Sequence, residues 1–349
     1  MISKKTIVVL LTLMVLVGGL FAKTKKLNIG IVYIGPARDG GWSQAHDDGI
    51  EEAKKLKSVK RVIKKENVPE SSEATKVITQ MVEVGKADIV FTTSFGYMDQ
   101  TLEVAANYPD KVFMHCSGYK RSDNVGTYFG KMYQAKYLAG MVAGAKTKSN
   151  KIGYVAPIPI PEIYRLINAF TLGVKAVNKD ATVNVVWIGD WFNPAKEMDA
   201  AKSMIEIGCD VITQGGDSPA PQQAAEAVEG VYSIGHDNDM KEYAPKSILT
   251  SAVWHWGVIY KEIAEQVANG TWKSESIWWG IETGVAGITK FSDKVSKKTQ
   301  KIVKEKEDDI KKGKLKIFEG PLYDQNGNKK VDDGVMMTDQ ELLSINWFV

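Results

Sequence analysis

The chain has 349 residues, of which 44% are hydrophobic and 25% are charged, and its 45 Lys and Arg nearly balance its 42 Asp and Glu. These proportions are those of a globular protein. A net charge of +3 provides no strongly basic surface, so nucleic acid is excluded as an expected partner.

The first 22 residues predict export. Lys4 and Lys5 form a positive start, residues 6–20 form an uncharged and mostly apolar run, and Ala22 is a small residue suited to a cleavage point. This order is typical of a secretory signal peptide, and about 15 apolar residues are short for a membrane span. An uncleaved anchor is the alternative. Because no cysteine lies near residue 22, we expect a periplasmic protein without a lipid anchor.

After the signal peptide, short apolar runs alternate with segments of helical periodicity. The predicted strands are 27–34, 60–64, 88–93, 111–116 and 125–129. The predicted helices are 43–56, 72–84, 101–107 and 134–145. Gly35-Pro36 ends the first strand, and Ser71 or Ser72 is the expected cap of the second helix.

The polar patch 146–150 separates this series from a second one. Its predicted strands are 151–155, 182–187, 210–214, 231–234 and 248–253, and its predicted helices are 162–177, 194–207 and 221–228. Such repeats form parallel sheets covered by helices on both faces. The predicted fold is therefore α/β, with two doubly wound lobes. The C-terminal residues depart from this alternation. There we expect a charged helix at 294–312, and a hairpin formed by 314–318 and a strand after Asn326-Gly327.

Signatures of catalysis are weak in this sequence. The 4 histidines are dispersed without metal-ligand spacing: His46, His115, His236 and His255. His236-Asp237 could act as an acid–base pair, but neighbours on an extended segment point in opposite directions. The chain contains neither a Walker phosphate loop nor a G-x-S-x-G elbow. We therefore expect no enzyme, metal or cofactor, and we expect Cys116 and Cys209 to be buried free thiols rather than a disulfide.

Candidate ligand-binding residues come directly after the predicted strands, because open parallel sheets bind ligands outside the carboxyl ends of their strands. Aromatic, carboxylate, glycine and serine residues recur there in both series: Asp39, Trp42, Ser94, Phe95, Trp191, Gly215, Asp217, Asp237 and Trp254. Aromatic side chains can stack on a flat ring, and carboxylates can accept hydrogen bonds from its N–H groups. The alternative for Trp42 is a core position beside a tight glycine turn.

Several segments, taken in order, resemble the basic membrane protein family of ABC-transporter binding proteins, which includes the purine nucleoside receptors of spirochaetes. The resemblance spans nearly all of the mature chain. The segments that carry it are Asp39-Gly40-Gly41-Trp42-Ser43-Gln44, Gln134-Ala135-Lys136-Tyr137-Leu138-Ala139-Gly140, Lys151-Ile152-Gly153-Tyr154-Val155, Trp191-Phe192-Asn193-Pro194-Ala195-Lys196 and Ile234-Gly235-His236-Asp237.

The resemblance implies a type I periplasmic-binding-protein fold with three crossovers between the lobes. We expect lobe 1 to comprise 26–148 plus 250–272, and lobe 2 to comprise 149–249 plus 273–349. The resemblance also implies a monomer that delivers a purine to a membrane permease and its ATPase. Trp42 and Trp191 stand where the family stacks aromatic side chains on the purine, and Asp39 and Asp237 stand where it has aspartates.

One departure from the family concerns the ligand. Nucleoside-binding members carry a lysine that reaches the ribose in a Leu-Thr-Ser-x-x-Lys segment, whereas here Leu249-Thr250-Ser251-Ala252-Val253 is followed by Trp254. An unpaired sugar hydroxyl in a closed site costs about 1–3 kcal/mol. We therefore expect a free base such as adenine to bind better than its nucleoside. The alternatives are that Trp254 swings away and another group holds the ribose, that the ligand is a sugar, that the receptor feeds a membrane signalling protein, and that the protein processes nucleosides.

Overall fold

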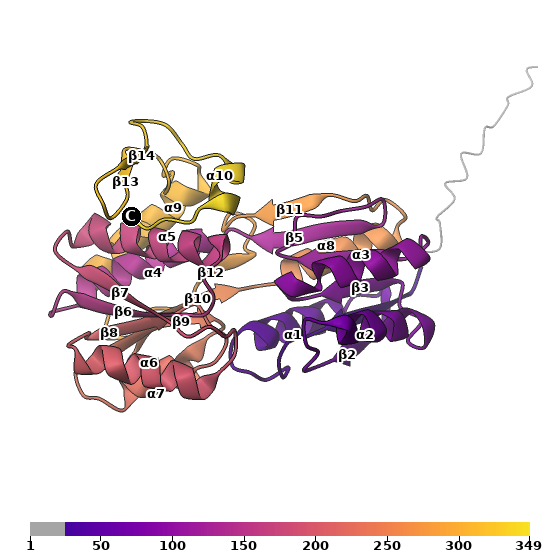
Figure 1. Cartoon of the computed structure of the whole chain (residues 1–349), viewed down its shortest axis with the longest axis horizontal. Helices are drawn as coiled ribbons and strands as arrows, with labels where there is room; N and C mark the ends of the chain where they lie inside the picture. Colours follow the sequence, from indigo (N-terminus) through magenta and orange to yellow (C-terminus); the bar gives the residue numbers. More distant parts are fainter. Residues whose placement is uncertain (1–24) are drawn as a thin grey trace, which may run out of the picture.

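The alternating strand and helix segments form two lobes, each built around its own six-stranded sheet (Figure 1). The computed structural model describes residues 25–349, so the signal peptide predicted at 1–22 lies outside the described residues. Helices cover both faces of each sheet, as the sequence predicted for an α/β protein of this class.

Lobe 1 contains a fully parallel sheet with the strand order β11-β5-β4-β3-β1-β2. Its strands are β1 (Leu27–Val32), β2 (Val59–Lys65), β3 (Ile89–Thr92), β4 (Val112–Cys116), β5 (Val125–Gly130) and β11 (Ser276–Trp279). Its helices are α1 (Trp42–Ala53), α2 (Ser72–Glu83), α3 (Met98–Asn107), α8 (Gly257–Ala268) and the short 3-10 helix η1 (Phe95–Tyr97). Ile29 and Ile31 pack in the same apolar cluster as α1, whereas Val32 packs in the cluster that contains α2. Because side chains alternate between the two faces of the sheet along β1, this strand packs against a helix layer on each face.

Lobe 2 repeats the arrangement with the strand order β12-β10-β9-β8-β6-β7, in which only β12 is antiparallel to its neighbour. Its strands are β6 (Lys151–Ala156), β7 (Thr182–Trp187), β8 (Val211–Gln214), β9 (Tyr232–Asp237), β10 (Ile248–Trp254) and β12 (Ala286–Ile288). Its helices are α4 (Met132–Lys146), α5 (Pro161–Val177), α6 (Pro194–Glu206), α7 (Ala220–Glu226), α9 (Lys297–Lys311) and the 3-10 helix η2 (Met240–Glu242). A Cβ on Gly140 would lie 2.1 Å from the Phe170 carbonyl oxygen, so glycine lets α4 and α5 pack closely.

The chain crosses between the lobes three times, at residues 131, 255–256 and 280–285. The boundaries predicted at 148, 250 and 272 are therefore wrong. α4 packs on α5 in lobe 2, β10 pairs with β9 in lobe 2, and β11 pairs with β5 in lobe 1. The polar patch 146–150 misled the prediction because it is the exposed loop between α4 and β6, whereas α4 itself is buried on nearly all sides.

The C-terminal part adds a two-stranded hairpin and a short helix to lobe 2. The hairpin pairs β13 (Leu322–Tyr323) with β14 (Lys329–Val331), and α10 (Asp339–Ser344) contacts α5. The first hairpin strand lies at 322–323 and not at the predicted 314–318, because Asp324 caps the turn by accepting from the backbone N–H groups of Asn326 and Asn328.

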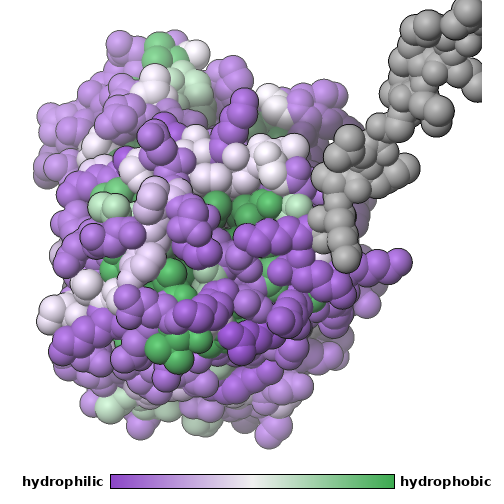
Figure 2. Space-filling model, turned by 90° about the vertical axis from the view of Figure 1, so that its right-hand side faces the viewer, coloured by the Kyte–Doolittle hydropathy of each residue, from purple (hydrophilic) through white to green (hydrophobic). Residues whose placement is uncertain are grey.

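Cys116 and Cys209 are buried and free, as predicted. Hydrophilic side chains cover most of the end of the molecule formed by lobe 1, with small hydrophobic groups between them (Figure 2). Among residues 25–349, no helix is long and apolar enough to cross a membrane.

Candidate functional site

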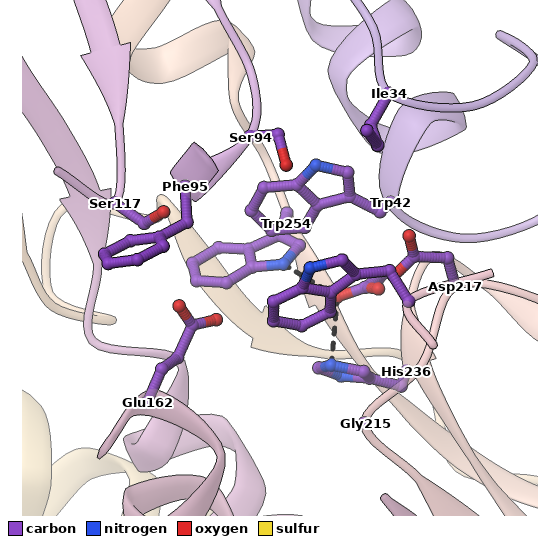
Figure 3. A pocket seen from close by; sticks show the side chains of 12 residues that line it. Ile34, Trp42, Ser94, Phe95, Ser117, Glu162, Gly215, Asp217, His236 and Trp254 are labelled. Atoms are coloured by element: carbon purple, nitrogen blue, oxygen red, sulfur yellow. Dashed lines mark hydrogen bonds and ion pairs between the residues drawn. The ribbon is translucent and has the colours of Figure 1, made fainter. Parts of the chain in front are cut away.

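The carboxyl ends of the two sheets face one another across a pocket between the lobes. The pocket holds about 430 Å³ of empty space, part of it open to solvent. Residues that follow β1, β3 and β4 supply its lobe 1 side. Residues that follow β6, β7 and β8, together with the last residues of β9 and β10, supply its lobe 2 side. It is lined by Ile34, Trp42, Ser94, Phe95, Ser117, Glu162, Trp191, Gly215, Asp217, His236, Asp237 and Trp254 (Figure 3). The pocket therefore lies where the general rule for open parallel sheets expects a ligand, outside the carboxyl ends of the strands.

The predicted binding residues all line this pocket except Asp39. The Asp39 carboxylate instead accepts hydrogen bonds from the backbone N–H groups of Gly41 (2.8 Å), Ser43 (2.8 Å) and Gln44 (3.0 Å). These are the free donors at the start of α1, where a carboxylate is a favoured cap. Asp39 thus stabilises the loop that carries Trp42, and its side chain does not face the ligand space.

Tryptophan side chains form much of the wall. The Trp42 indole N–H donates to the Thr93 carbonyl oxygen (2.7 Å), which fixes the ring over the loop after β3. The Trp254 ring stacks on Trp256 at 4.3 Å between centroids and meets Trp42 edge-on at 6.0 Å. Phe95 enters the same space from the loop after β3 (Figure 3). These faces are suited to a flat apolar ring.

Asp237 is the most constrained carboxylate of the pocket. Its backbone has φ +65°, a left-handed conformation that aspartate tolerates better than most residues. Its Oδ1 accepts a hydrogen bond from the Trp254 indole N–H (2.9 Å) and lies 3.1 Å from His236 Nε2. The expectation that His236 and Asp237 point in opposite directions is therefore wrong, because the left-handed turn ends the extended strand between them. Burial lowers the pKa of His236, so this ring is neutral.

Asp217 and Glu162 bring two further carboxyl groups to the pocket. Within residues 25–349, no side-chain or backbone donor bonds to the Asp217 carboxylate. Burial raises the pKa of Asp217 well above its usual range, and the nearby carboxylates Asp237, Asp39 and Glu197 raise it further. Burial also raises the pKa of Glu162 to about 7. The pocket can therefore present carboxyl groups in both protonation states near neutral pH.

Sequence reasoning missed several lining residues: Ile34, Ser117, Glu162 and His236. Glu162 is the second residue of α5, where an acidic residue is the normal choice beside the positive end of a helix. Ser117 has φ +56° directly after β4, a strand end that was not among the predicted binding positions. The strand-end rule could have found Ile34 and Ser117, but it could not have found Glu162, which lies several residues beyond β6.

Two α/β lobes that meet over a buried, aromatic-walled pocket define a solute-binding protein of the kind that encloses its ligand between lobes. Solved solute-binding proteins of ABC transporters share this fold. One from Conexibacter woesei has a TM-score of 0.70 and 22% identity, covering 83% of this chain and 97% of that one. Another from Aeropyrum pernix has a TM-score of 0.71 and 19% identity, covering 83% and 92%.

Residues 26–326 match the Bmp family model, described as ABC transporter substrate-binding protein PnrA-like, and the chain belongs to this family. A purine-binding protein of Brucella abortus is 39% identical over 335 residues, covering 96% of this chain and 95% of its own. A protein of Haloferax volcanii described as an ABC transporter glucose-binding protein is 36% identical over 307 residues, covering 88% and 78%.

Family membership confirms the resemblance inferred from the sequence. The chain is an extracytoplasmic substrate-binding protein of an ABC importer and not an enzyme. It takes a small-molecule ligand, and a permease with its ATPase are its partners.

Proposed function

We propose that this protein delivers a purine to its importer, and that it binds the free base, adenine for example, more tightly than the nucleoside. It acts as a soluble periplasmic monomer after loss of residues 1–22. The observation that carries the proposal is the position of Trp254 in the pocket wall, at the place where nucleoside-binding members of the family have a ribose-reaching lysine.

Trp254 is held firmly in that place. Its side chain is only 5% exposed, its ring stacks on Trp256 at 4.3 Å, and its indole N–H bonds to Asp237 at 2.9 Å. Swinging the ring away would break the stack and leave the buried Asp237 carboxylate short of a donor, at about 1–3 kcal/mol. This geometry supports the interpretation that the indole closes the sugar end of the pocket.

The remaining lining residues have roles that suit a purine base. Trp42, Phe95 and Trp191 supply faces for stacking on the bicyclic ring. Asp217 and Asp237 provide carboxyl groups for its amino and ring nitrogen atoms. The Brucella abortus relative is described as purine-binding, which agrees with this assignment.

Calorimetry with adenine and adenosine on refolded, ligand-free protein tests the proposal. The expected result is a lower Kd for adenine by roughly tenfold or more, which corresponds to one unpaired sugar hydroxyl. Trp254→Lys should narrow that difference or reverse it, because a lysine can donate to the ribose. Tighter binding of adenosine by the wild-type protein would overturn the base preference.

A sugar is the second candidate ligand, because the Haloferax volcanii relative is described as glucose-binding. Aromatic side chains also stack on sugars, and the same pocket could serve a nucleoside- or sugar-binding receptor that feeds a membrane signalling protein. Glucose in the same calorimeter separates these candidates. Binding of glucose without binding of adenine or adenosine would replace the purine assignment.

A further inference from the structure

Glu162 brings into the pocket a carboxyl group that no other part of the protein engages. It is the second residue of α5, it is partly buried, and it lines the same cavity as Trp254 and Ser117. Among residues 25–349, no donor bonds to its side-chain oxygens and no cation pairs with them. Arg165, the nearest cation along α5, donates instead to the Leu342 carbonyl oxygen (2.7 Å). A carboxylate that is withdrawn from water needs another donor, so the ligand has to supply one.

The place of Glu162 in its helix does not explain where its side chain points. An acidic residue in the first turn is favoured by the positive end of the helix. A carboxylate turned toward solvent would satisfy that preference without losing its hydration. Figure 3 shows the Glu162 carboxylate turned toward the Trp254 ring instead, into the space left for a ligand. This direction indicates a contact with the ligand.

Most of the other carboxylates near the pocket already have a donor from the protein: Asp39, Asp237 and Glu197. Asp217 resembles Glu162, because no donor among residues 25–349 bonds to its carboxyl group. Figure 3 shows Asp217 toward one end of the pocket and Glu162 toward the other. The pocket therefore presents an unengaged carboxyl group at each of two ends, which suits a flat ligand with N–H groups on opposite edges.

We propose that Glu162 is a specificity-determining residue, which accepts a hydrogen bond from the N–H group on the imidazole edge of a purine base. In a free base the ring nitrogen N9 can carry a hydrogen, whereas in a nucleoside the same nitrogen carries the sugar and has no hydrogen. The amino group of a 6-aminopurine lies on the opposite edge of the ring, toward Asp217. The ligand class that satisfies both ends is a purine that is unsubstituted at N9.

This inference rests on the proposed purine ligand and gives its base preference a second cause. Trp254 excludes a sugar by occupying its space, whereas Glu162 stabilises the bound base through the hydrogen that a sugar would replace. Both effects act at the same end of the pocket, because the Glu162 carboxylate points toward the Trp254 ring (Figure 3). A nucleoside would therefore collide with the indole and also leave the carboxylate without a donor.

The test compares adenine with 9-methyladenine, which keeps the ring and the amino group but has no N–H at N9. Calorimetry measures the Kd of both ligands in the wild-type protein and in Glu162→Met, which keeps the length of the side chain without an acceptor. The buffer is held at about pH 8, because burial raises the pKa of Glu162 to about 7 and the carboxylate has to be ionised.

The wild-type protein should bind adenine at least about tenfold more tightly than 9-methyladenine, as expected for a hydrogen bond to a charged group. Glu162→Met should weaken adenine binding by about 10- to 100-fold, and the two ligands should then bind within about threefold of each other. Glu162→Gln should lie between the two proteins, because its amide oxygen accepts a hydrogen bond without a charge.

Asp217→Asn is the matched control, because it alters the unengaged carboxyl group at the other end of the pocket. It should weaken both ligands alike, since both carry the amino group, and it should leave the preference for adenine unchanged. Thermal unfolding of the ligand-free variants identifies a structural effect. If Glu162 only stabilised the start of α5, Glu162→Met would lower the melting temperature and weaken both ligands equally.

Equal Kd values for adenine in Glu162→Met and the wild type would overturn the proposal. Equal losses for both ligands, or a preference for adenine that persists in the variant, would do the same. The wild-type protein also gives a result that does not depend on how a variant folds. If it binds 9-methyladenine within about threefold of adenine, Glu162 does not select the N–H at N9.

Adenosine in the same calorimeter separates this inference from the proposed function. No binding of adenine, or tighter binding of adenosine, would contradict the proposed function itself. A preference for adenine over adenosine, together with equal binding of 9-methyladenine, would leave the proposed function in place and overturn the role of Glu162 alone.

Discussion

Gly41 controls how closely the two lobes can approach. It precedes α1 in lobe 1, and a Cβ on it would lie 2.2 Å from the carbonyl oxygen and 2.8 Å from the carbonyl carbon of Asp217 in lobe 2. Both of these atoms belong to the backbone, so no side-chain rotation can relieve the collision. Gly41→Ala should therefore keep the lobes from closing fully over a ligand.

The expected size of this effect follows from the overlap. Forcing an extra methyl group into a packed contact costs about 1–3 kcal/mol, which corresponds to a Kd weakened by about 5- to 150-fold. The contact exists only when the lobes are closed. The melting temperature of the ligand-free protein should therefore change by less than about 2 °C, well below the shift that the same energy would cause within one lobe.

The assay combines calorimetry with adenine, thermal unfolding without ligand, and small-angle scattering with and without adenine. Gly287→Ala is the matched control, because no atom lies within 4 Å of a Cβ at this position. Wild-type affinity and ligand-induced compaction in Gly41→Ala would refute the closure argument. A lowered melting temperature of the ligand-free variant would also refute it, by placing the strain inside lobe 1.

Three further predictions follow from other contacts. Trp191→Ala should weaken adenine binding about tenfold or more with little loss of stability, because Trp191 is only half-buried. Trp42→Ala should reduce both the affinity for adenine and the free energy of unfolding, because Trp42 also packs on Trp256. Asp39→Ala should lower the free energy of unfolding by about 1–2 kcal/mol, since three backbone N–H groups lose their acceptor. Burial raises the pKa of Glu197 to about 7, so the folded protein holds this proton between about pH 4.5 and pH 7. The contribution of Glu197 to the free energy of unfolding should therefore fall as pH rises through that window, by at most about 3 kcal/mol, and Glu197→Gln should make the decline of the whole protein shallower by that amount.

Each of these predictions has a result that contradicts it. Equal stability losses in Trp191→Ala and Trp42→Ala would mean that Trp191 is a core residue. Lost adenine binding in a fully stable Asp39→Ala protein would restore Asp39 as a ligand contact. Parallel curves of melting temperature against pH for the wild type and Glu197→Gln would show that Glu197 does not titrate in this window. Thermal unfolding and calorimetry supply all three measurements.

The strand-and-helix alternation predicted both lobes, because apolar runs of strand length followed by helical periodicity leave little choice of architecture. The same alternation did not predict where the chain crosses between the lobes, for a physical reason. The chain passes between lobes within a few residues, and the strands that return, such as β11, look the same in sequence whichever sheet they join. Pairing of β11 with β5 is a tertiary fact that no local pattern encodes.

The strand-end rule located most of the pocket but could not distinguish a ligand contact from a cap. Asp39 and Asp217 both follow strands in glycine-rich loops, yet only Asp217 lines the pocket, since the three N–H groups at the start of α1 engage Asp39.

The identity of the bound cargo is the central claim, and mass spectrometry tests it most directly. Protein produced with its own signal peptide in a bacterial host is purified without dialysis, denatured, and the released small molecules are identified. The account predicts a free purine base, with adenine above its nucleoside. Release of a hexose, or of nucleoside alone, would contradict it.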